Sequence, residues 1–260
     1  MTVGEPDLRA GSDRPVALAL LLLSLLASVF WAALALVAPS GGEVMPEGGA
    51  AAASLPWRAA RMALLFLMWA GLCTALMLPL ASRAAVLFAR LAGRRAQSAR
   101  RRARRCTFLF VLAYLLAWTG FALLAMVAQW TLDAAAVASA DLARHPTVLG
   151  LALAAAGIYQ WTPSKHACLE HCRAPLPGIL AGWRDGLPGA FGRGAAHAYQ
   201  SLGCCWLLML VLLAAGPDNP AAIAAIGLLV LAEIRLESGH WIACAGGLAL
   251  LALGTRLLFP

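Results

Sequence analysis

The sequence predicts an all-α fold, a polytopic bundle of about seven transmembrane helices with its amino terminus in the cytoplasm. The composition is 62% apolar and only 12% charged, whereas about a quarter of the residues in soluble globular domains are charged. Several apolar runs reach the roughly 18 residues that a helix needs to cross a bilayer, and the alternating pattern of a β-barrel is absent. Because only helices then remain as spanning elements, and abundant Ala and Gly let helices approach closely, we expect one compact bundle.

The amino-terminal part of the chain predicts a short head and two spans. Residues 1–15 are polar and are expected to form a disordered cytoplasmic head. The apolar run 16–37 is longer than the roughly 7 to 15 residues of a signal-peptide core, so it is predicted to be a retained first span. The following loop, 39–56, carries no Lys or Arg and is expected to face outward. The second span is predicted at 57–80, with its end near Pro79.

A basic segment follows the second span. It contains nine arginines, at 83, 90, 94, 95, 100, 101, 102, 104 and 105. By the positive-inside rule, the loop from Arg83 to Arg105 stays in the cytoplasm, where anionic lipid headgroups are its expected partners. Nucleic acid is the alternative partner for a basic run, but this run lacks interleaved aromatic residues and joins two spans. We therefore predict a lipid bilayer partner and no nucleic acid.

The remaining spans are predicted near 106–132, 147–162, 195–215, 221–236 and 241–259. With the amino terminus inside, this topology places 16 of the 20 basic residues on or next to cytoplasmic segments. Residues 16–259 are thus predicted to form a single transmembrane domain.

Four of the seven cysteines and three of the five histidines lie within residues 159–206. Cys168 and Cys172 share a face if a short helix begins at Pro163, and His197 and Cys204 lie on one stripe of the fifth span. All of them are expected near the cytoplasmic side, which keeps thiols reduced. Thiolate and imidazole together favour copper or zinc over hard cations. The predicted metal ligands are Cys168, Cys172, His197 and Cys204.

Further candidate ligands each have an alternative interpretation. Cys205 is equally compatible with packing, and His166 and His171 with an interfacial position near headgroups. Glu233 is an ionisable group at membrane depth, where such groups usually have a partner; Arg235 is its neighbour in sequence, and Gln160 and Glu233 are expected to orient the ligands. The other cysteines are interpreted as small packing residues: Cys73, Cys106 and Cys244. His240 opens the seventh span on the same side of the membrane.

Several motifs around these residues occur together and in a fixed order. They are residues 157–163 with Lys165, residues 168–173, residues 183–186, His197, residues 203–206 and Glu233. With them the chain resembles a bacterial family of predicted metal-binding integral membrane proteins, domain of unknown function 2182. The resemblance implies a multi-pass protein of the bacterial inner membrane. The chain departs from the family by having fewer soft ligands, with Leu72, Cys73 and Leu76 at expected methionine positions and Ser201 at an expected cysteine.

The leading hypothesis is a membrane protein, not an enzyme, that binds copper or zinc and passes it to a delivery partner. One alternative is a membrane thiol oxidoreductase in which Cys168 with Cys172 and Cys204 with Cys205 relay electrons. Another is a transporter or a subunit of a larger membrane complex, because Gly and Pro interrupt the fourth and fifth spans where they meet the inner loop.

Overall fold

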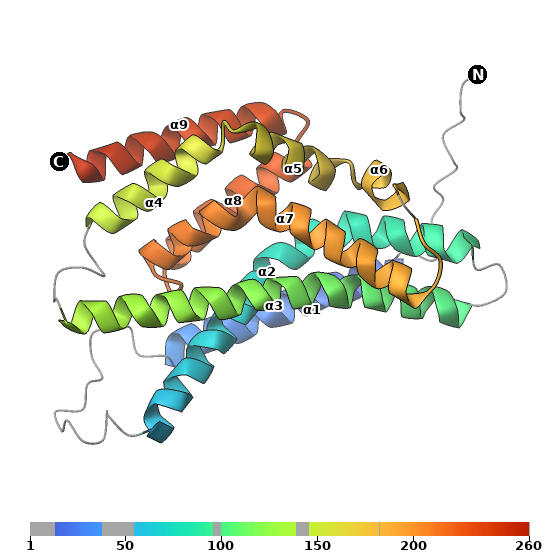
Figure 1. Ribbon diagram of the computed structural model, residues 1–260, viewed down its shortest axis with the longest axis horizontal. Coiled ribbons are helices and arrows are strands. Elements are labelled where there is room, and N and C mark those ends of the chain that lie inside the picture. Colours follow the sequence, from blue (N-terminus) through green and yellow to red (C-terminus); the bar gives the residue numbers. More distant parts are fainter. Residues whose placement is uncertain (1–13, 38–54, 96–99, 139–145, 182, 260) are drawn as a thin grey trace.

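The computed structural model describes residues 14–37, 55–95, 100–138, 146–181 and 183–259 (Figure 1). Within these residues helices are joined by short turns and no strand occurs, which confirms the all-α prediction. Most of the predicted head, residues 1–13, lies outside the described part. The helices are α1 (Arg14–Val37), α2 (Leu55–Arg95), α3 (Arg100–Ala138), α4 (Pro146–Tyr159), α5 (Pro163–Arg173), α6 (Pro175–Leu180), α7 (Leu187–Ala215), α8 (Pro220–Arg235) and α9 (Gly239–Leu258).

Five of the described helices are long and apolar enough to cross a membrane, which supports a membrane protein. They contain the segments Pro15–Leu34, Ala59–Gly93, Arg101–Leu132, Leu187–Ala215 and Gly239–Leu258. The predicted fourth and sixth spans correspond to the shorter helices α4 and α8, of 14 and 16 residues. At about 1.5 Å per residue, neither crosses a hydrocarbon core of roughly 30 Å alone.

The basic segment differs from the predicted loop. α2 does not stop near Pro79 but continues to Arg95, and α3 already begins at Arg100. Pro79 removes one backbone donor, which would leave the carbonyl of Ala75 without its helical partner. The Ser24 hydroxyl donates to that carbonyl at 3.2 Å, so the helix can pass the proline. All of the described residues between 83 and 105, which are 83–95 and 100–105, are therefore helical.

α4 and α9 run antiparallel (Figure 1), and their backbones contact each other through pairs of glycines. A Cβ atom placed on Gly157 would lie 2.7 Å from the carbonyl oxygen of Gly247, and one on Gly254 would lie 2.7 Å from that of Gly150. Only small residues permit such an approach between membrane helices. This contact fixes α9 against the end of α4.

Two chain corners meet at mid-length of the molecule, where α4 passes into α5 and α8 passes into α9 (Figure 1). Pro163 starts α5, the short helix on which the shared face of Cys168 and Cys172 depended, and the Thr162 hydroxyl caps it by accepting a hydrogen bond from the Lys165 amide. Arg173, at the end of α5, donates to the carbonyls of Glu233 and Glu237, at 2.7 Å each. The corners are thus joined, and α5 lies between α7 and the α8–α9 corner.

Candidate metal centre

A fully buried ion pair lies at the centre of this corner. Lys165 Nζ is 2.7 Å from Glu233 Oε2, and the exposed fraction of both side chains is 0%. The other carboxylate oxygen accepts a hydrogen bond from Gln160 Nε2 at 2.6 Å. Lys165 Nζ also donates to the carbonyl of Cys204 at 2.8 Å. Buried charges are tolerated when they are paired and hydrogen-bonded in this way, so these contacts hold α4, α5, α7 and α8 together.

Three buried thiols lie beside this ion pair, where α5 packs on α7. Cys172, Cys204 and Cys205 belong to one buried core cluster, and the Cys204 thiol interacts electrostatically with the other two. All three side chains are buried. Interaction with the Cys204 thiol, followed by burial, raises the pKa of the Cys172 thiol. A metal binding there has to displace a proton from sulfur.

Cys168 lies one turn before Cys172 and is half-buried. Its sulfur rests against Gly203, because a Cβ atom on that glycine would lie 2.7 Å from Cys168 Sγ. Burial raises the pKa of the Cys168 thiol. The structure therefore brings three of the predicted ligands, Cys168, Cys172 and Cys204, to one helix contact, with Cys205 beside them.

His197 does not join these thiols. Its ring stacks with those of Phe110 and Tyr114, with centroid distances of 6.0 and 5.7 Å. His197 and Cys204 do share a face of α7, but seven residues separate them, which is about 10 Å along the helix axis. That separation is too large for both side chains to bind one ion. His197 packs against α3, whereas Cys204 contacts α5.

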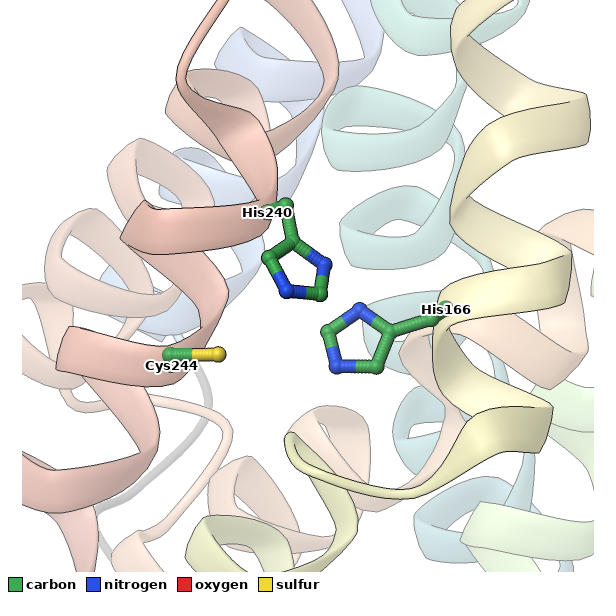
Figure 2. Close-up of side chains that lie close together, drawn as sticks. All are labelled: His166, His240 and Cys244. Atoms are coloured by element: carbon green, nitrogen blue, oxygen red, sulfur yellow. The ribbon is translucent and has the colours of Figure 1, made fainter.

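The remaining candidates on α5 point to different places. His171 is outside both groups, since its Nδ1 donates to the carbonyl of Ala167 at 2.7 Å. His166 instead points towards α9, where it meets His240 and Cys244 (Figure 2). The potential ligand atoms of these three residues all lie within 4.8 Å of one another, and no other His, Cys, Asp or Glu group of this size is so close among the described residues.

Sequence reasoning assigned Cys244 to packing and did not connect His240 with His166. His240 and Cys244 are four residues apart in α9, the spacing that places two ligands on one helix face. The rings of His166 and His240 have centroids 4.1 Å apart at an angle of 39°. Burial, followed by the nearby imidazole of His240, lowers the pKa of His166. The spacing of His240 and Cys244 was the available signal, but their third partner is distant in sequence.

A comparison with known proteins identifies the family of this chain. Residues 66–257, well over half of the chain, match the model of a family named PpoB2, copper chaperone. No curated protein and no solved structure matches the chain. The matched segment extends from α2 into α9, so it contains the thiols of α5 and α7 as well as the group formed by His166, His240 and Cys244.

Proposed function

Because the chain belongs to the copper chaperone family PpoB2, we propose that it is an integral membrane protein that binds copper as its cargo where α5 packs on α7. The observation that carries this proposal is the cluster of thiols at that contact, Cys172 with Cys204 and Cys205, and Cys168 at its edge. The family favours copper, and the zinc alternative has no corresponding support.

The chemistry of the thiols suits Cu(I). Thiolate sulfur is the preferred ligand of this soft ion, and Cys172 and Cys204 present two sulfurs from α5 and α7, which pack on each other. When copper displaces both thiol protons, the resulting dithiolate complex carries a net negative charge. The Lys165 ammonium, held at the carbonyl of Cys204, lies close enough to offset that charge in a poorly solvated interior. Gln160 and Glu233 keep the ammonium in place.

The proposal includes a multi-pass topology of about seven apolar helices in the bacterial inner membrane, two of which are the short α4 and α8, with the amino terminus and the thiols towards the cytoplasm. In Figure 1 the arginine-rich ends of α2 and α3 lie on the right and α5 extends from the middle towards them, while α9 ends on the left. Arginines next to membrane spans favour the cytoplasmic side and contact with anionic lipids. A cytoplasmic position keeps the thiols reduced. The protein then hands copper to a protein partner and catalyses no reaction.

Copper content of the purified protein tests this proposal. Detergent-purified protein is reduced, loaded with Cu(I) without oxygen, freed of excess metal and analysed for copper per chain. The variant Cys172→Ser/Cys204→Ser is expected to lose at least one equivalent relative to the wild type. Cys106→Ser is the matched control, because Cys106 is also buried but belongs to a separate cluster around Phe88 and Phe110.

A double variant with the copper content of the wild type would show that the thiols are not the site. Non-reducing electrophoresis after trapping thiols in cells distinguishes copper handling from the alternative of a thiol relay. A relay predicts a mixed disulfide with another protein through Cys172 or Cys204, whereas copper handling predicts free thiols that become protected from alkylation when Cu(I) is added.

A further inference from the structure

His166, on the side of α5 that faces α9, forms with His240 and Cys244 a group that has the properties of a second metal site. We propose that His166, His240 and Cys244 bind a second copper ion, through two imidazole nitrogens and one thiolate sulfur. The inference rests on the proposed function for the identity of the cargo, but it uses none of the thiols at the α5–α7 contact. Figure 2 shows the rings of His166 and His240 and the sulfur of Cys244 pointing into one space between α5 and α9.

The distances between these potential ligand atoms are close to those between the ligands of one bound metal ion. A first-row ion such as zinc is held by His nitrogen at about 2.0 Å and by Cys sulfur at about 2.3 Å, so ligand atoms around one ion lie roughly 3.3 to 4 Å apart. The three candidate ligand atoms already lie within 4.8 Å of one another. Small side-chain rotations are therefore enough to close the site around an ion.

One ring nitrogen of this group lacks a hydrogen-bond partner among the described residues. His166 Nδ1 is buried, yet it has no hydrogen bond to any residue that the structure describes. A buried polar atom without a partner destabilises the fold, and a bond to a metal would remove that cost. The imidazole of His171 on the same helix shows the contrast, because its Nδ1 is satisfied by the carbonyl of Ala167.

The backbone around the group is fixed by neighbouring contacts. Trp161 Nε1 donates to the carbonyl of Cys244 at 3.1 Å, which ties the α4–α5 corner to α9. Next to His166, the Lys165 side chain is anchored to Glu233. Ligands held on two braced helices have little conformational freedom to lose when a metal binds.

Accessibility distinguishes this site from the buried thiols and suggests its role. His240 is exposed, and His166 and Cys244 are half-buried, whereas Cys172, Cys204 and Cys205 are buried. Copper at His166, His240 and Cys244 can therefore be reached from outside the bundle. Cys244 releases its thiol proton when the ion binds and takes it back when the ion leaves. We assign to this site the exchange of copper with the surroundings, and to the buried thiols its retention.

Anaerobic titration with Cu(I) against a chromophoric Cu(I) chelator tests the second site in the full-length protein. The wild type is expected to bind two equivalents. His166→Ala/His240→Ala should bind one equivalent, and X-ray absorption at the copper edge should then show sulfur ligands only. His171→Ala is the matched control and should keep both equivalents, because His171 is a histidine of the same helix outside the group.

The outcomes separate this inference from the function proposed above. If Cys172→Ser/Cys204→Ser retains one equivalent with nitrogen ligands, the second site stands alone. If the histidine variant keeps the full copper content and nitrogen signal of the wild type, the second site is overturned, whatever the thiols bind. Cys244→Ser, which leaves both rings in place, should weaken binding of the second equivalent at least tenfold. An unchanged affinity for that equivalent in Cys244→Ser would also contradict the proposal.

Discussion

The two sides of α5 differ in whether their charged groups and candidate ligand atoms have partners. Lys165, Leu169 and Cys172 follow each other at helical spacing and form the buried side. There the ammonium and both carboxylate oxygens of Glu233 have partners, and only Gln160 Oε1 of this network has none among the described residues. His166, the next residue after Lys165, turns to the outer side and keeps a buried nitrogen without a partner among the described residues. The difference indicates two roles for α5. Buried charged groups with partners stabilise the fold, whereas ligand atoms without partners can bind and release an ion.

The largest expected loss of stability comes from removing one partner of the buried ion pair on the inner side of α5. Lys165→Met leaves the Glu233 carboxylate buried without its counter-ion, and removing one partner of a buried pair typically costs about 3 to 5 kcal/mol. Thermal unfolding in detergent should show a markedly lower melting temperature than for the wild type. The outer variant His166→Ala/His240→Ala should unfold close to the wild-type temperature, since it removes no satisfied buried charge.

The double variant Lys165→Met/Glu233→Gln supplies the control for that prediction. It removes both charges and should recover part of the lost stability, because a neutral amide is cheaper to bury than an unpaired carboxylate. A melting temperature of Lys165→Met equal to that of the wild type would show that the pair does not stabilise the corner.

A smaller loss of stability is expected at the contact between α4 and α9, which positions the outer ligands. A Cβ atom on Gly247 would lie 2.8 Å from Gln160 Cβ and 2.9 Å from the Gly157 carbonyl oxygen. Gly247→Ala should therefore push the helices apart, at a cost of about 1 to 3 kcal/mol for overpacking. Relative to the wild type, chelator competition should show a larger loss of copper affinity at His166, His240 and Cys244 than at the thiols.

Gly120→Ala is the matched control for this substitution. A Cβ atom on Gly120 of α3 meets nothing within 4 Å, and Ala favours a helix over Gly. Its stability should equal or slightly exceed that of the wild type. A copper affinity at His166, His240 and Cys244 that is unchanged from the wild type in Gly247→Ala would mean that the glycine contact does not position these ligands.

The helical fold and the thiol contact could be predicted from the sequence, because both depend on local patterns. Apolar runs predict helices, and the spacing of Cys168 and Cys172 places two sulfurs on neighbouring turns of a helix that begins at Pro163. The pattern also placed His197 and Cys204 on one face. The pattern did not show that these side chains, about 10 Å apart along the helix axis, contact different neighbouring helices.

The remaining contacts depend on residues that are far apart in the chain. Arg235 is near Glu233 in sequence, but its guanidinium donates to the Pro79 carbonyl at 2.8 Å, and Lys165 pairs with Glu233 instead. Likewise, nothing local connects His166 to His240. Sequence spacing indicates which side chains share a helix face, whereas only the packing of α5 and α9 shows which faces meet.

The inner side can also be disturbed without removing a ligand. Gly203→Ala places a Cβ atom 2.7 Å from Cys168 Sγ, and the cysteine can move away by rotating. Stability should change little, but copper affinity at the thiols should fall on the order of tenfold, equivalent to about 1.4 kcal/mol, if Cys168 contributes a ligand. Chelator competition measures this, with the second equivalent as an internal reference. Unchanged affinity would exclude Cys168 from the site.

The smallest expected effect concerns the support of the outer site. Trp161→Phe keeps the aromatic ring but removes the hydrogen bond to the Cys244 carbonyl. A hydrogen bond of this kind contributes about 0.5 to 1.5 kcal/mol, and Trp161 is 40% exposed, so the low end of that range applies. Copper affinity at His166, His240 and Cys244 should fall by roughly twofold to threefold, which corresponds to about 0.5 kcal/mol, while the thiols keep theirs. An equal decrease at both sites would mean that Trp161 supports the whole corner, and the two sides of α5 would then be coupled.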